Sequence, residues 1–99
     1  MTAAVEPPGK HLRRALRARG WTQADLAMIL GRPERFVSEL INGRRGLTAR
    51  TALELGAALG DDPWEWMKRE VAYRLSIAAS LDHLKIRARV QRFQKRKTA

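Results

Sequence analysis

The hydrophobic pattern of this chain has the period of an α-helix. Apolar residues recur three or four positions apart in five successive segments, at residues 9–19, 23–30, 33–42, 48–60 and from 63 to about 75. Glycines lie at the ends of the first four segments, and Pro33 and Pro63 begin two of them, as is typical of helix ends. No segment alternates apolar and polar residues as a strand does. We therefore expect an all-α fold with five helices.

The junction of the first two helices carries its own signals. Gly20 is expected in the left-handed conformation that ends a helix, which places Trp21 over Leu16 in the hydrophobic contact of that cap. Thr22 is a good N-cap, and Asp25 three residues later forms an imperfect capping box with it. A sharp turn between two helices follows from these four side chains and one glycine.

The second and third helices are short, and one tight break at Gly31 separates them. Their apolar positions give each helix an inner face, formed by Leu26, Ala27, Leu30, Val37, Leu40 and Ile41. Small Ala27 permits the helices to cross closely. The outer face of the third helix is polar, with Arg35, Ser38, Glu39 and Asn42. Two short helices arranged in this way are the layout of a helix-turn-helix, and this layout indicates DNA binding.

The end of the chain is strongly basic. The net charge is +10, and residues 83–99 contain seven Lys or Arg residues and no acid. Ile86, Val90 and Phe93 have helical spacing there and suggest a sixth, amphipathic helix. We divide the chain into a loose lead-in (1–8), a helix-turn-helix domain (9–79) and a basic helical arm (80–99). The arm suits a polyanion such as DNA, or it is a solvated and partly disordered end.

Several classes of protein are disfavoured. There is no cysteine, and His11 and His83 are far apart, so we expect neither a metal site nor a cofactor. Helix capping explains the paired carboxylates Asp61 and Asp62, so we do not expect an enzyme. No apolar run could span a bilayer and the start lacks a secretory signal, so we expect a cytoplasmic protein without a membrane partner. A single core in 99 residues also favours a dimer.

Three stretches carry a resemblance to a known family: WTQADLA at residues 21–27, VSELINGRRGLT at 37–48 and TAL at 51–53. They resemble the xenobiotic-response-element/Cro-type helix-turn-helix family. Further positions, Ala57-Ala58-Leu59-Gly60, Pro63, Trp66 and Ala72-Tyr73, are similar to HigA-type antitoxins of bacterial toxin–antitoxin modules. The resemblance covers residues 8–75. It implies a five-helix Cro/repressor-like domain, and the basic extension has no counterpart in it.

The resemblance also implies which residues touch double-stranded operator DNA. Gln23 and Asn42 match positions that grip phosphates, and Arg44 and Arg45 match basic positions beside the DNA backbone. The base-facing positions of the recognition helix match Glu34, Arg35, Phe36, Ser38 and Glu39. Two acids in this set are unusual. Each acid either accepts from a cytosine amino group or orients Arg35, and we favour an i, i+4 pair for Glu39. Arg35 then reads a guanine, and Phe36 touches a thymine methyl group.

The fifth helix carries more apolar surface than a lone helix needs. We expect homodimer contacts from Trp64, Trp66, Met67, Val71 and Leu75. For the two tryptophans a place in the core is the alternative to the dimer contact, and both are preferred to a role in base stacking.

Three functions remain open from the sequence. The resemblance implies a transcriptional repressor that is also an antitoxin, which neutralises a HigB-like mRNA-cleaving toxin and represses the operon that the two share. A second possibility is a stand-alone regulator of the same family without a toxin. A more remote one is an RNA- or ribosome-associated protein that uses residues 87–97 as an arginine-rich segment.

Overall fold

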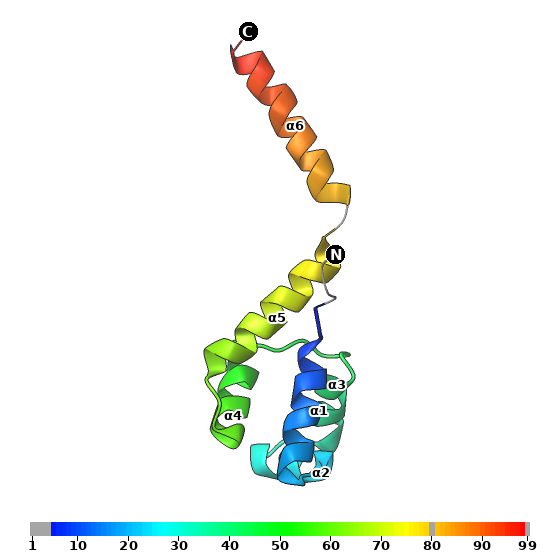
Figure 1. Cartoon of the computed structure of the whole chain (residues 1–99), viewed down its shortest axis with the longest axis vertical. Coiled ribbons are helices and arrows are strands. Elements are labelled where there is room, and N and C mark those ends of the chain that lie inside the picture. The colour runs from blue at the N-terminus through cyan, green and yellow to red at the C-terminus, as the bar shows by residue number, and fades with distance from the viewer. Residues whose placement is uncertain (1–4, 80, 99) are drawn as a thin grey trace.

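The computed structural model describes residues 5–79 and 81–98 (Figure 1). Within these residues the chain forms six helices and no strand, which confirms the all-α expectation. The helices are α1 (Pro8–Arg19), α2 (Gln23–Leu30), α3 (Glu34–Ile41), α4 (Ala49–Leu59), α5 (Pro63–Ala78) and α6 (Leu81–Thr98). Their bounds lie within a few residues of those predicted, because the capping residues and glycines at the helix ends act through neighbours in the sequence.

The predicted left-handed glycine and the N-cap between α1 and α2 are present. Gly20 has φ 69°, and the backbone N–H of Trp21 donates to the carbonyl of Leu16 at 2.9 Å. The hydroxyl of Thr22 accepts from the N–H of Asp25 at 3.1 Å, and the Asp25 carboxylate accepts from the N–H of Thr22 at 2.8 Å. The capping box is therefore complete, and the Asp side chain is long enough to close it.

The core is formed by the inner faces of α1, α2, α3 and α4, and α5 adds Trp66 to it. Its largest fully buried side chains are Trp66, Leu12, Leu26, Leu55 and Val37. Trp66 is fully buried, so its assignment to the dimer contacts is wrong and the alternative of a core position holds. The helical repeat gives the reason: Trp64 and Trp66 lie about 200° apart around the helix axis, so only one of them can face outward.

The sixth helix extends beyond the end of α5 and points away from the five-helix unit (Figure 1). The helix predicted from the spacing of Ile86, Val90 and Phe93 is therefore present. These three side chains remain 50–57% exposed. Among the described helices, none is long and apolar enough to cross a membrane.

Candidate nucleic-acid interface

The third helix presents one polar face to solvent. Val37, Leu40 and Ile41 are buried against the core, and this fixes the rotation of α3 about its axis. The opposite face carries Glu34, Arg35, Ser38, Glu39 and, at the C-cap, Asn42. The side chain of Arg35 is 87% exposed. The Asn42 amide donates to the Ser38 hydroxyl at 3.3 Å, so the C-terminal half of this face is already ordered.

Phe36 does not belong to this face. It is 9% exposed and part of the hydrophobic core, so the expected contact with a thymine methyl group is wrong. Residues 36, 37, 40 and 41 follow one another around the helix, which places Phe36 at the edge of the inner stripe. The guanidinium groups of Arg32 and Arg45 lie 4.7 Å and 4.8 Å from its ring centroid. Phe36 thus supports two cations beside the outer face.

Glu39 interacts with two arginines. Its carboxylate lies 4.0 Å from Nε of Arg35, the predicted i, i+4 pair, and 3.2 Å from Nη2 of Arg45. The interaction with Arg45 could not be predicted from the sequence, because it depends on how the loop after α3 folds back. Two cations offset the acid, so Glu39 does not place an uncompensated negative charge on the face. Arg35 keeps most of its guanidinium free for other contacts.

The basic loop after α3 is tied to the helix through its backbone. The N–H groups of Arg44 and Arg45 both donate to the carbonyl of Glu39, at 2.9 Å and 3.2 Å. Gly43 has φ 73°, a conformation that lets the chain reverse here. The side chain of Arg44 is exposed, and in the described part of the chain it forms no ion pair. Of the two loop arginines, Arg44 is therefore the one available to a phosphate.

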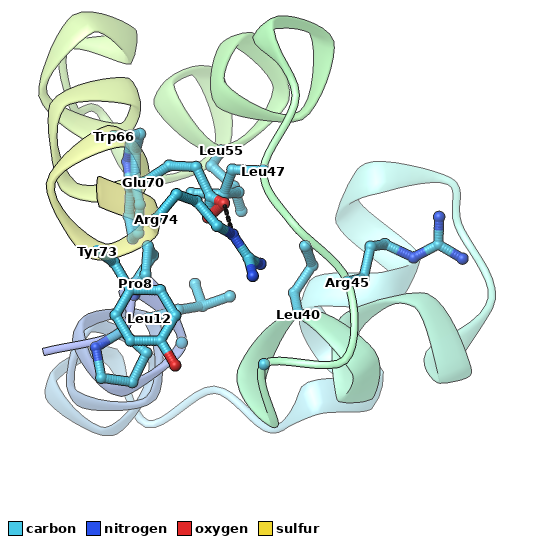
Figure 2. A pocket seen from close by; sticks show the side chains of 13 residues that line it. Pro8, Leu12, Leu40, Arg45, Leu47, Leu55, Trp66, Glu70, Tyr73 and Arg74 are labelled. Carbon is cyan, nitrogen blue, oxygen red and sulfur yellow. Dashed lines mark hydrogen bonds and ion pairs between the residues drawn. The ribbon is translucent and has the colours of Figure 1, made fainter. Parts of the chain in front are cut away.

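An ion pair from α5 supports the same loop. Nε of Arg74 lies 2.9 Å from the carboxylate of Glu70, which is 7% exposed as a residue. Figure 2 shows this pair reaching toward Leu47, while Arg45 points away from it. A Cβ on Gly46 would lie 3.2 Å from atoms of both partners, so the loop packs directly on the pair. The i, i+4 spacing of the pair is visible in the sequence, but its contact with Gly46 is not.

The remaining predicted DNA contact, Gln23, is the first residue of α2 and is partly buried beside the capping box. The structure thus leaves Arg35, Asn42 and Arg44 exposed at the polar face and its loop, and Gln23 partly exposed at the start of α2. Glu34 and Ser38 also lie on this face, and the ion pair of Glu39 with Arg45 links the face to the loop that follows α3. Hydrogen-bond donors and an exposed arginine fork of this kind are suited to a DNA groove and its phosphates.

A second exposed surface lies on the opposite side of α5 from Trp66. Trp64, Met67, Val71 and Leu75 follow one another at i, i+3, i+7 and i+11 and form one stripe. Trp64 is 75% exposed, Val71 49% and Leu75 66%, and Leu53 of α4 beside them is 62% exposed. At one end Leu53, Trp64 and Met67 line a groove of about 210 Å³. Met67 also packs against the core from this stripe.

Two short crossed helices with a polar outer face and a basic loop define a helix-turn-helix protein. The sequence model of the helix-turn-helix family matches residues 12–62, and the chain belongs to this family. It is 35% identical over 72 residues to virulence-associated protein I of Dichelobacter nodosus, a match that covers 72% of this chain and 67% of the relative.

Solved structures give a narrower likeness. An addiction module antidote protein of the HigA family from Coxiella burnetii is 29% identical with a TM-score of 0.77, over 87% of this chain and 95% of that one. The antitoxin HigA of Pseudomonas aeruginosa, solved with the higBA promoter, is 26% identical with a TM-score of 0.76. That match covers 83% of this chain and 90% of the other.

Proposed function

We propose that this chain is a sequence-specific DNA-binding repressor that acts as the antitoxin of a two-gene module. The observation that carries the proposal is the exposed polar face of α3, with the Arg35 side chain exposed and Glu39 neutralised, in a fold that matches a promoter-bound HigA antitoxin over most of its length. It is a binding protein rather than an enzyme, and its place is in the cytoplasm with the DNA. A stand-alone regulator without a toxin is the alternative.

In the proposed complex, α3 enters the major groove. Arg35 donates both arms of its guanidinium to a guanine edge, which is the commonest specific contact in such complexes. Glu39, which is itself paired with Arg45, orients Arg35. Gln23, Asn42 and Arg44 donate to phosphates on either side of the groove, and these contacts fix the protein on the duplex without reading sequence.

The proposed active species is a homodimer. Two copies pair through the stripe of Trp64, Met67, Val71 and Leu75, with Leu53 beside it, because an apolar stripe this exposed is unfavourable on a monomer. A two-fold dimer places two α3 helices on half-sites about one helical turn of DNA apart.

The toxin, an mRNA-cleaving nuclease by the resemblance, is usually basic. A basic antitoxin must therefore meet it through acidic or apolar surface, since like charges at an interface cost several kcal/mol.

Two measurements test this function. The purified chain is titrated onto duplex DNA from upstream of its own gene and onto a shuffled duplex of equal length, and we expect at least a thousandfold preference for the first. The chain is then co-expressed with the product of the neighbouring gene. Relief of growth arrest together with a complex on size exclusion supports the antitoxin role. DNA preference without relief leaves the stand-alone regulator, and no preference rejects both.

A further inference from the structure

A basic groove lies beside the helix-turn-helix, between α1, the end of α3 and α5. Its volume is about 520 Å³. Four cations of α1 line it: Lys10, Arg13, Arg14 and Arg17. Asn42 and Tyr73 line it from the other elements, and among the described residues no acid lines it. A groove with this lining attracts an anionic ligand.

The cations share this groove because of their spacing. Residues 10, 13, 14 and 17 lie at i, i+3, i+4 and i+7, which is one face of a helix, while Leu12 and Leu16 on the other face are buried. Arg14 is partly neutralised, because its Nη2 lies 2.6 Å from the carboxylate of Glu6. In the described part of the chain, Arg13 and Arg17 form no ion pair. Their charges are available to a ligand.

The groove is continuous with the proposed DNA surface. Asn42 is both the C-cap of α3 and part of the lining. Gly9 holds the start of α1 against the end of α3, since a Cβ there would lie 2.6 Å from the carbonyl oxygen of Leu40. A DNA strand that passes Asn42 on the side of this groove would meet the cations of α1.

One neutral donor completes the groove. The hydroxyl of Tyr73 points away from the Glu70–Arg74 pair in Figure 2, and no hydrogen bond is formed by it among the described residues. A phenol of this kind is a ready donor to a phosphate oxygen.

We propose that this groove binds phosphates of the DNA backbone beyond the bases that α3 reads, with Arg13 and Arg17 as the main contacts and Lys10 and Tyr73 beside them. Lys10 and Arg17 are roughly 10 Å apart along the helix axis. A row of cations of this length is long enough to contact more than one phosphate of a DNA strand. The inference rests on the proposed function, and it adds α1 as a second contact with the DNA backbone.

The test compares salt dependence among single-charge variants of the full chain. Arg13→Gln, Arg17→Gln and the matched control Lys68→Gln each remove one positive charge. Lys68 is exposed on α5, outside this groove, and lies 3.1 Å from Glu65. Affinity for the upstream duplex and for a random duplex is measured over a range of salt concentrations. For each α1 variant we expect the log–log slope to fall by about 0.9 on both duplexes. Lys68→Gln should keep the wild-type slope, and base preference should be unchanged throughout.

Tyr73→Phe adds a readout that charge alone would not change. Loss of a neutral donor should weaken binding to both duplexes roughly fivefold and leave the salt slope unchanged. Thermal melting of every variant confirms that it is folded.

The possible outcomes separate the two proposals. Slopes of the α1 variants equal to that of Lys68→Gln overturn the groove as a phosphate site, while a retained preference for the upstream duplex keeps the proposed function. The α1 variants could also keep the wild-type salt dependence and lose binding to the neighbouring gene product. That result would assign the groove to a protein partner, and it too overturns the inference. If the wild type shows no sequence preference, the proposed function fails, and the slopes on the random duplex still decide whether the groove holds phosphates.

Discussion

Gly9, in the first turn of α1, lies directly against the carbonyl oxygen of Ile41 at the end of α3. A Cβ placed on Gly9 would overlap that oxygen and would approach the neighbouring Leu40 oxygen to 2.6 Å. Both obstacles are backbone atoms, so no side-chain rotation relieves them. The absence of a side chain at position 9 therefore sets how closely the first helix approaches the proposed recognition helix.

Gly9→Ala should destabilise the fold by about 1–3 kcal/mol, because α1 and α3 must move apart to admit a methyl group. A change of this size lowers the melting temperature by roughly 4–8 °C per kcal/mol in a domain of this size. Ala18→Ser, at an exposed position of the same helix, is the control and should change stability by less than about 0.5 kcal/mol. Equal melting temperatures for Gly9→Ala and the wild type would mean that the two helices are less closely packed than described.

Arg35→Ala should weaken binding to the cognate operator by about 1–3 kcal/mol and relax the preference at one base pair. Arg44→Ala is the natural comparison, since it removes a group proposed to bind phosphate and should weaken binding to all duplexes alike. Competition binding with operators changed at single base pairs measures both effects. A uniform loss for Arg35→Ala would assign it to the backbone as well.

The difference between Arg35 and Phe36 shows what the sequence could predict about the site. Position 35 lies in the middle of the polar face, and the helical repeat alone places it outward. Position 36 lies at the boundary between faces, where an aromatic side chain turns inward if the core has room, and the core depends on all five helices. The family pattern marks both positions as base-facing, so the resemblance is misleading at Phe36.

Contacts between different helices and loops could not be predicted from the sequence either. The capping box of Thr22 and Asp25 was predictable because its atoms belong to residues three apart. The contact of Gly46 with the Glu70–Arg74 pair joins a loop to a helix more than twenty positions away, and no local pattern encodes it. The helices and the polar outer face of α3 could therefore be predicted from the sequence, whereas the contacts that support the loop after α3 are seen only in the structure.

Trp64→Asp should convert the proposed dimer to a monomer, because it places a charge on the apolar stripe. Trp64 is 75% exposed, so the fold of the single chain should survive the change. Light scattering at micromolar concentration measures the mass, and circular dichroism confirms the helices. A wild-type chain that is monomeric at this concentration with full operator affinity would contradict the dimer.

The basic arm should contribute to DNA affinity through charge alone. Deleting residues 84–99 should flatten the dependence of affinity on salt, by roughly 0.9 in the log–log slope for each phosphate that the arm binds, and base preference should stay the same. Arg89, Arg92 and Arg96 are exposed and share one face of α6. Replacing all three by Gln should reproduce most of that effect. Ile86→Ser on the apolar face is the control and should leave the slope unchanged. An unaltered slope after deletion would assign the arm to a protein partner.

His11 should make the fold less stable in mild acid. Its ring meets Trp66 edge to face at a centroid distance of 5.1 Å. Burial lowers the pKa of His11 below its usual value of 6.5, and the charges of Arg69 and Arg14 lower it further, against smaller opposing effects of Asp61 and Glu6. The unfolded chain therefore takes up a proton at higher pH than the folded chain. The contribution of the neutral ring is present above about pH 6.5 and is lost as the pH falls through the folded value. Urea unfolding is measured at pH 7.5 and at pH 5. Between these pH values the free energy of unfolding should fall more for the wild type than for His11→Asn. Equal decreases would show that the imidazole titrates alike in the folded and unfolded chains.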